Sequence, residues 1–285
     1  DSCYFSAWPV LKKEVAEGRM AWSKETCIQL YDGIADQVND SFPAFMEQAF
    51  HCPRDMGSLI RAGREMVADR GLFITKKRYA LQYFDKENRR YDVDGKMGKI
   101  KAMGLDLKRS DTPEFMQKFL EEILTRVLNG SEEKEVLDRI IEFRTEFKAR
   151  PGWEKGSPKR ANNITDYSEK EKKAGKANMP GHVRASINWN TFKRMNSDKY
   201  SMGIVDGMKV IVCKLKPNAL KMTSIAYPTD ELRLPEWFKD LPFDDDAMEQ
   251  TLVDEKIDNL LGVLDWKIRE NTDVKSTFND LFSFG

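Results

Sequence analysis

Histidine and paired cysteines are scarce in this chain of 285 residues. It has two histidines, His51 and His182, and four cysteines, which stand alone at positions 3, 27, 52 and 213. No two cysteines form a CxxC pair, and neither histidine lies beside such a pair, so a zinc site is not expected. Isolated cysteines of this kind indicate reduced thiols in a cytoplasmic protein.

The chain also lacks a long apolar run and a net charge. It has no stretch of about 18 apolar residues, so neither a transmembrane helix nor a membrane partner is expected. Lys plus Arg and Asp plus Glu number 47 each, which gives a formal net charge of zero. A neutral total does not exclude nucleic-acid binding, because basic residues can still gather on one face. The length suffices for one large or two modest domains.

The first residues have neither an initiator Met nor a signal-peptide pattern. Residues 1–6, with the sequence DSCYFS, alternate as in a short β-strand, without a preceding cap or turn. We therefore expect the chain to continue in an upstream piece, or to have been cut from one.

Hydrophobic spacing predicts a long amphipathic helix followed by a β-hairpin. Within residues 22–50 apolar side chains recur every three or four positions, and Pro43 is a point where the helix can bend. These apolar positions are Ile28, Tyr31, Ile34, Val38, Phe42 and Phe45. Residues 57–83 are rich in β-formers, and Asp-Arg-Gly at 69–71 predicts the hairpin turn. A charged loop is expected over 85–99.

The second part of the chain is expected to be mainly helical. A helix-start signal at residues 111–114 precedes a first helix, and a second helix follows Gly130. Their predicted buried positions are Phe115, Phe119, Ile123 and Val127 in the first helix, and Val136, Ile140, Phe143 and Phe147 in the second. Residues 150–181 are expected to be mostly loop. A strand over 207–215 and an amphipathic helix over 246–268 complete the pattern.

Two basic motifs stand out. The first is Lys76-Lys77-Arg78-Tyr79 at the end of the predicted hairpin. If all four residues lie in a strand, Lys77 and Tyr79 share one face and Lys76 and Arg78 share the other. A cation beside a phenol suits a groove that holds phosphates without reading sequence. A solvated edge strand with protective lysines explains the same tetrad.

The second motif, over residues 99–113, places four cations before the start of a helix. They are Lys99, Lys101, Lys108 and Arg109. Phosphate groups favour both cations and the free backbone N–H groups of a helix start. A basic loop that merely leads into a helix is the alternative.

Taken together, the motifs resemble family B DNA polymerases. Their order is DS-x-Y at the first residues, then KKRY, then K-x-M-G-L-[DE]-x-x-[KR]-S-x-T-P. Ala161-Asn162-Asn163 and His182-Val183-Arg184 narrow the resemblance to T-even-like phage polymerases. The last residues, 278–284, are similar to the clamp-binding tail of those enzymes. The resemblance spans essentially the whole chain in the right order.

The resemblance implies a fold and a domain order. The expected class is α+β: the C-terminal part of a polymerase palm, followed by a mostly helical thumb with a small β element. Residues 1–104 would be the palm part, 105–274 the thumb and 275–285 the clamp-binding tail. A phage-encoded enzyme of this kind would work in the host cytoplasm.

The resemblance also implies a catalytic role for the first residue. Asp1 would be the second aspartate of the family's D-T-D-S palm motif and a ligand of one of two Mg²⁺ ions. Glu65 would match an acidic palm residue near the active site; alternatively it is an exposed strand carboxylate. The two metals serve the attack of the primer hydroxyl on a deoxynucleoside triphosphate. The other metal-binding aspartates would belong to an upstream polypeptide with the exonuclease, the fingers and the rest of the palm.

Further residues are implied in contacts with primer–template DNA and with the sliding clamp. The Lys76–Tyr79 tetrad would hold the duplex near the primer end, chiefly through Lys77 and Tyr79. The residues implied in backbone contacts farther along are Lys101, Lys108, Arg109, His182 and Arg184. His182 is equally well explained as a satisfied, half-buried side chain. The clamp-binding residues would be Phe278, Leu281, Phe282 and Phe284, unless the tail packs back on its own domain.

Two functions from different classes follow. The first is template-directed DNA synthesis performed jointly with the upstream polypeptide. The second is a non-catalytic module that binds DNA and the clamp, which the incomplete metal site favours for this chain in isolation. A neighbouring reading frame ending in D-T or Y-G-D-T would identify the two chains as one enzyme.

Overall fold

The computed structural model describes residues 3–174, 178–264 and 266. They form a mixture of helices and antiparallel sheets, in agreement with the predicted α+β class. Two compact units are present. Unit 1 comprises residues up to Gly71 together with Ala80–Lys101, and unit 2 comprises Leu72–Tyr79 together with residues from Ala102 onward. The assignment of palm, thumb and tail to 1–104, 105–274 and 275–285 stays a prediction.

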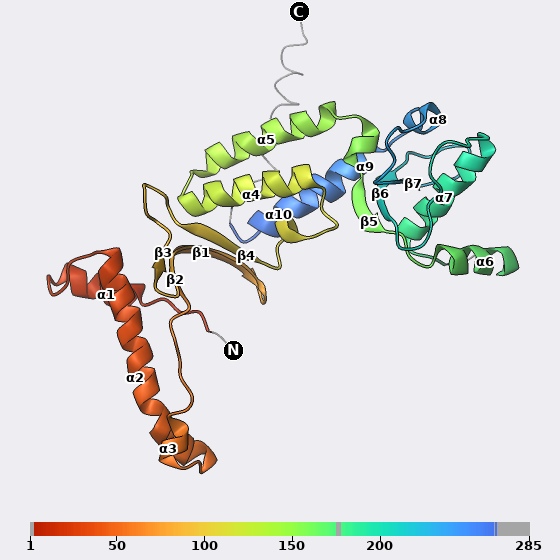
Figure 1. Ribbon diagram of the computed structural model, residues 1–285. Helices are drawn as coiled ribbons and strands as arrows, with labels where there is room; N and C mark the ends of the chain where they lie inside the picture. The colour runs from red at the N-terminus through yellow and green to blue at the C-terminus, as the bar shows by residue number, and fades with distance from the viewer. Residues whose placement is uncertain (1–2, 175–177, 265, 267–285) are drawn as a thin grey trace, which may run out of the picture. The chain divides into compact units, whose positions relative to one another are not determined.

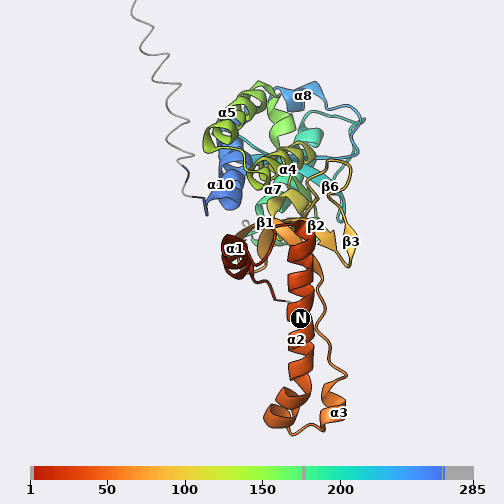
Figure 2. The same cartoon turned by 90° about the vertical axis from the view of Figure 1, so that its left-hand side faces the viewer.

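Unit 1 is built on the long helix α2 (Lys24–Phe50), which confirms the helix predicted over 22–50. Ser23 caps it by accepting a hydrogen bond from the Thr26 N–H at 3.0 Å. The helix ends at His51, whose φ of 53° is left-handed. The shorter helices α1 (Trp8–Ala16) and α3 (Arg54–Gly57) flank it, and α3 lies beside the end of α2 (Figure 1, Figure 2).

The strand predicted over residues 1–6 is wrong for the described residues 3–6, which have no regular secondary structure. Instead this segment lies along α2. The Ala7 N–H donates to the Tyr31 hydroxyl at 2.9 Å, and the ring of Phe5 lies 5.4 Å from that of Tyr31. Side-chain contacts with a helix therefore replace the ladder that a strand would need.

A four-stranded sheet follows, comprising β1 (Met66–Thr75), β2 (Arg78–Lys86), β3 (Arg89–Arg90) and β4 (Lys99–Met103). β2 pairs with β1, β3 and β4. In the antiparallel β2–β3 pair, Asp85 lies opposite Arg90 and Lys86 opposite Arg89.

The turn of the first hairpin does not lie at residues 69–71, as predicted, but at Lys76 and Lys77. β1 continues through 69–71 because its side chains find partners there and beyond. The Asp69 carboxylate lies 3.0 Å from the Lys24 ammonium, and Leu72 is buried. Farther along, Phe73 stacks on Tyr79 across the hairpin at a ring distance of 5.8 Å.

The helical part of unit 2 pairs α4 (Glu114–Asn129) with α5 (Glu133–Ala149). All four positions predicted to be buried in α5 are buried. In α4 the prediction was half right, since Phe115 and Val127 are only half-buried. Its buried residues are Met116, Phe119, Leu120, Ile123, Leu124 and Leu128. This stripe is wider because α4 contacts both α5 and α10 (Glu255–Leu261), as Figure 1 shows.

The rest of unit 2 is a three-stranded antiparallel sheet covered by a helix. Its strands are β5 (Ser157–Arg160), β6 (Lys209–Lys214) and β7 (Ser224–Pro228), in that order. Helix α7 (Gly181–Met195) packs on β7, and Trp189 is fully buried in the core between them. The smaller helices are α6 (Ile164–Ala174), α8 (Glu236–Lys239), α9 (Asp245–Glu249) and the 3-10 turn η2 (Gly152–Lys155).

Residues 150–181 are therefore more ordered than predicted. β5 lies in this segment because it pairs with β6, with Ser157 opposite Val212 and Arg160 opposite Lys209. A partner about fifty residues away leaves no local signal in so Gly- and Lys-rich a sequence. The strand predicted over 207–215 is confirmed as β6. The predicted last helix consists of α9, a π-helical turn η3 (Gln250–Asp254) and α10. No helix in the described ranges is both long and apolar enough to cross a membrane.

Candidate nucleic-acid interface

Lys76 and Lys77 form the two-residue turn at the tip of the β1–β2 hairpin, in unit 2. Both are exposed, and Lys77 has a left-handed φ of 65°. The alternating faces predicted for the tetrad are therefore wrong, because only Arg78 and Tyr79 lie in a strand. The turn projects two cations together, with the stacked rings of Phe73 and Tyr79 behind them. Two exposed ammonium groups at a hairpin tip suit contacts with a phosphate backbone.

The segment after β4 packs closely against this turn. Gly104 has a left-handed φ of 63°, and a Cβ added there would lie 2.4 Å from the Lys77 carbonyl oxygen. A side chain at this position would therefore displace the turn. Because position 104 is a glycine, this part of the second basic motif can lie in contact with the Lys76–Lys77 turn of the first.

Arg78 ties the hairpin to the helices of unit 2. Its Nε donates to the Gly104 carbonyl at 3.2 Å and its Nη2 to the Asn259 carbonyl at 3.4 Å. The same Nη2 lies 3.7 Å from an oxygen of Asp106, which belongs to the 3-10 helix η1 (Asp106–Lys108). With only 30% of its side chain exposed, Arg78 is placed to position the tip.

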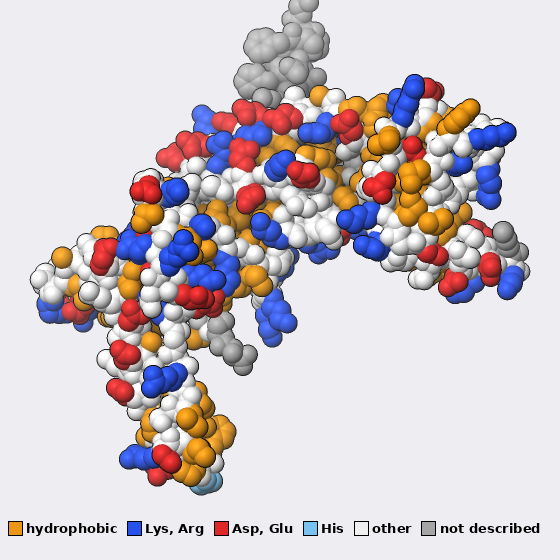
Figure 3. All heavy atoms as spheres, in the orientation of Figure 1, with side chains coloured by type: hydrophobic (Ala, Val, Ile, Leu, Met, Phe, Trp, Pro, Cys, Tyr) orange, Lys and Arg blue, Asp and Glu red, His pale blue; other side chains and the backbone are white. Residues whose placement is uncertain are grey.

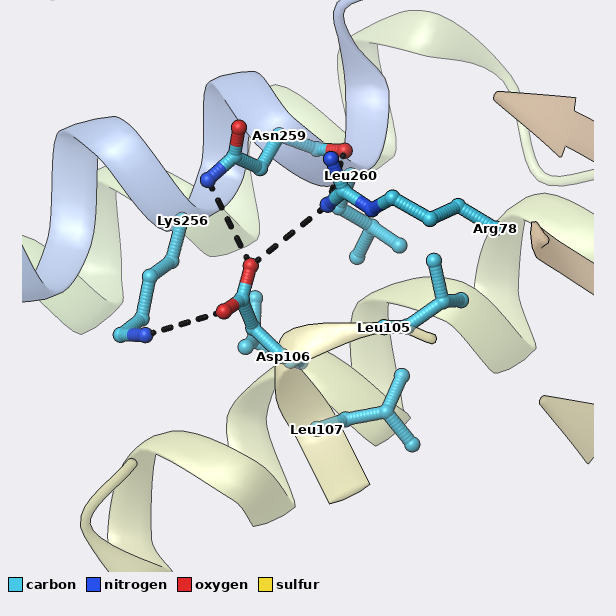
Figure 4. A pocket seen from close by; sticks show the side chains of 8 residues that line it. Arg78, Leu105, Asp106, Leu107, Lys256, Asn259 and Leu260 are labelled. Atoms are coloured by element: carbon cyan, nitrogen blue, oxygen red, sulfur yellow. Dashed lines mark hydrogen bonds and ion pairs between the residues drawn. The ribbon is translucent and has the colours of Figure 1, made fainter. Parts of the chain in front are cut away.

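Asp106 lies in a small pocket with apolar walls, including Leu105 and Leu107 (Figure 4), and pairs with the cations Arg78, Lys256 and Arg109. Besides facing Arg78, its carboxylate lies 3.2 Å from the Lys256 ammonium and accepts from the Asn259 amide at 3.4 Å. The Asp106 and Lys256 side chains are only 11% and 12% exposed. Low exposure strengthens such a pair and makes an unpaired member costly.

We expect Asp106→Ala to lower the free energy of unfolding by about 2–4 kcal/mol, because it leaves Lys256 and Arg78 facing a partly buried, uncharged site. Urea titration followed by circular dichroism measures this. Glu121→Ala is the matched control: its carboxylate is 58% exposed, and the expected change is within about 0.5 kcal/mol. Equal stability of the two variants would show that the Asp106 network does not hold the hairpin.

A second cluster of charges joins Arg109 to β5. The Arg109 guanidinium makes a two-pronged contact with Asp111 at 2.9 and 3.0 Å, and the Lys159 ammonium lies 3.0 Å from the same carboxylate. The hydrogen bond from Arg109, assisted by Lys159, holds the pKa of Asp111 well below its usual range. Arg109 also lies 3.6 Å from Asp106 and so joins the two clusters. In the joined cluster four cations, Arg78, Arg109, Lys159 and Lys256, surround two carboxylates, which leaves an excess positive charge. Lys108 is 60% exposed and lies 3.9 Å from Glu121.

His182 and Arg184 lie in the first turn of α7. Burial, and then the positive charge of Lys159, lower the pKa of His182 below its ordinary value of 6.5. His182 is half-buried, and its contact with DNA stays a prediction. Arg184 forms an ion pair with Glu171 of α6 at 2.5 Å.

Lys101 and Glu65 face each other in unit 1. The Lys101 ammonium lies 3.0 Å from the Glu65 carboxylate, whose side chain is 46% exposed. The structure therefore pairs a predicted phosphate contact with a predicted active-site acid. Across residues 3–174, 178–264 and 266, no group of three or more His, Cys, Asp or Glu is arranged to hold a metal ion. These residues alone do not fit a two-metal centre.

The other predicted site residues lie outside the described part of the chain. They are Asp1 and the tail residues Phe278, Leu281, Phe282 and Phe284. Conversely, sequence reasoning missed Lys159, Lys256 and Asn259. Lys256 is separated from Asp106 by 150 positions, so no spacing rule connects them.

Two curated proteins match the chain. The DNA-directed DNA polymerase of Enterobacteria phage T4 is 30% identical over 200 residues, or 70% of this chain. The DNA-directed DNA polymerase of Escherichia phage RB69 is 34% identical over 160 residues, or 56% of it. This chain is a relative of the T4-type phage DNA polymerases. The resemblance inferred from the ordered motifs is thereby confirmed.

The chain matches only a small part of each relative's length. The matched segment is 20% of the length of the T4 enzyme and 17% of that of the RB69 enzyme. No family model matches the chain. A polymerase-related function follows from the similarity, whereas the part that this chain plays in such an enzyme is a matter for proposal.

Proposed function

We propose that this chain is the C-terminal piece of a replicative DNA-directed DNA polymerase. In this role it grips the primer–template duplex, contributes one aspartate to the catalytic metal site and docks on the sliding clamp. The observation that carries the proposal is the similarity to two phage polymerases. Support for the grip comes from the exposed Lys76–Lys77 turn in the same unit as Lys108 and Arg109.

The grip is electrostatic and independent of sequence. Exposed lysine ammonium groups at a turn reach phosphate oxygens without approaching base edges. The Asp106 network fixes the base of the hairpin, so the lysines lose less conformational freedom on binding. Arg109 provides a second phosphate contact, and the neighbouring Lys159 adds to the positive charge there.

The catalytic part of the proposal rests on Asp1. A divalent metal pair in a polymerase activates the attacking primer hydroxyl and stabilises the leaving phosphates. Asp1 would supply one ligand, and the rest of the polymerase the others. Glu65, paired with Lys101, is proposed as a carboxylate near that centre and not as a further metal ligand.

The test is duplex binding by the enzyme assembled from this chain and the remaining polymerase part. Lys77→Ala is expected to weaken primer–template binding by roughly 1–3 kcal/mol and to reduce the salt slope by about one. Fluorescence anisotropy at several salt concentrations measures both quantities. Lys118→Ala is the control, because Lys118 is 74% exposed on α4 and pairs with its neighbour Glu114. Unchanged affinity and slope for Lys77→Ala would make the turn a merely solvated hairpin tip.

His182 gives the grip an expected pH dependence. Its lowered pKa leaves the imidazole neutral at pH 7, and a nearby phosphate favours the protonated form. Affinity should therefore rise as the pH falls from 7 into the acidic range where the imidazole takes up its proton. The same anisotropy assay on His182→Gln should show a smaller rise. An identical pH profile would place His182 away from the DNA.

A further inference from the structure

The far end of the α2 arm in unit 1 carries a cluster of exposed apolar side chains, here called the arm surface. It consists of Phe45, Phe50, Met56, Leu59 and Ile60, whose exposed fractions are 53%, 65%, 53%, 76% and 46%. Figure 3 shows hydrophobic side chains gathered at this end of the arm. Single exposed apolar residues are ordinary, but a contiguous group of five marks a contact surface.

The helix that carries this surface has the pattern of a buried helix. Apolar residues recur at spacings of three and four along α2, yet none of its 27 residues is buried in the described structure. In a helix of this length, one apolar face normally packs against another element. Within unit 1, the segment before α1, helix α3 and the chain that returns from α3 contact parts of α2, but they bury none of its residues.

The arm surface is held in a fixed shape. A Cβ added to Gly57 would lie 2.7 Å from Pro43 Cα, so α3 and α2 are in backbone contact there. The rings of Phe45 and Phe50 meet edge-on at 6.0 Å. The chain returning from α3 is clamped to α2 by Asn39, whose amide donates to the Ala62 carbonyl at 3.0 Å and accepts from the Ala62 N–H at 2.7 Å. A preformed apolar surface binds with little ordering cost.

We propose that the arm surface is the docking site for the remaining part of the polymerase. This inference rests on the proposed function and names the surface through which the two parts join. The occupant follows from the comparison: the matched segment is a fifth or less of each relative's length, so about four-fifths of a polymerase lies outside it. The arm surface, preformed and uncovered, is where that larger part packs.

The test uses the remaining polymerase part of the same phage, produced as a separate tagged polypeptide. Phe50→Glu combined with Leu59→Glu should weaken its association with this chain about tenfold or more, because two central apolar contacts become charged. Tyr200→Glu combined with Leu232→Glu is the matched control. Those residues are 98% and 101% exposed in unit 2, and association should be unchanged. Circular dichroism melting verifies that both variants stay folded.

Cys52 supplies an independent measurement on the unmodified chain. It directly follows the C-cap of α2, beside the arm surface, and is partly exposed, whereas Cys213 is fully buried. Maleimide labelling read by peptide mass spectrometry should show Cys52 protected when the polymerase part is added. Cys213 should stay unreactive throughout. This measurement decides the question if the double variant fails to fold.

Normal association of the Phe50 and Leu59 double variant, or unprotected Cys52 in the complex, would overturn the proposal. So would sedimentation of the chain alone as a dimer that this double variant dissociates, since the occupant would then be a second copy. Primer extension by the unmodified pair is read separately. If the unmodified pair extends primers but the double variant associates normally, only the proposed docking site is wrong. If the double variant associates more weakly but the unmodified pair extends no primer, the docking site is supported and the polymerase assignment is contradicted.

Discussion

Deletion of residues 278–285 is expected to abolish stimulation of DNA synthesis by the sliding clamp on long templates. Synthesis on short primers, without the clamp, should stay nearly intact, because no proposed DNA or metal contact lies in this segment. A tethered clamp keeps a polymerase close to the primer end after each dissociation, so its loss acts through effective concentration. Product length with and without clamp and clamp loader measures the effect.

Point substitutions should locate the effect within the tail. Phe282→Ala and Phe284→Ala are expected to reproduce most of the defect, because aromatic anchors dominate small interfaces. Asn279→Ala is the control and should matter less, since a polar side chain beside such anchors tends to stay hydrated. Full clamp stimulation of the truncated enzyme would mean that the tail is dispensable or packs on its own domain.

The spacing of apolar residues predicted the buried face of α5 and only part of that of α4. The spacing of Val136, Ile140, Phe143 and Phe147 describes the buried face of α5 correctly. For α4 the spacing failed at Phe115 and Val127, because contact with α10 as well as α5 shifts and widens the buried face. Which partners a helix has is a property of the fold, so its own sequence did not contain the answer.

The hairpin shows the same limit in a strand. Asp-Arg-Gly is a good turn sequence, but the chain turns seven residues later, at Lys76. The partners that extend β1, Lys24 for Asp69 and Tyr79 for Phe73, lie elsewhere in the chain. The sequence therefore identified the basic tetrad as a feature without predicting that its lysines form the turn.

The sequence predicted the residues of the candidate interface only where they belong to one of the two basic motifs. The motif at 76–79 lies against Gly104 of the motif at 99–113, because Gly104 closely approaches the Lys77 carbonyl. The groups that hold them, Lys256 for Asp106 and Lys159 for Asp111, come from distant elements. Ordered motifs pointed to the polymerase relatives more directly than any single residue did, since several motifs in one order carry more information than the chemistry of each motif alone.

Primer extension tests most directly whether this chain is one part of a polymerase. The purified chain alone is expected to extend no primer, because Asp1 is its only proposed metal ligand and the described residues contain no metal-binding cluster. Adding the remaining polymerase part should give extension in the presence of Mg²⁺ and deoxynucleoside triphosphates. Asp1→Ala should abolish that extension while leaving duplex binding unchanged.

The measurement is gel-resolved extension of a labelled primer by each part alone and by the mixture. The account predicts extension by the mixture only. Robust extension by this chain alone would contradict the account, and so would a mixture that forms the complex and binds primer–template DNA but extends nothing. The second result would identify the chain as a non-catalytic module that binds DNA and the clamp.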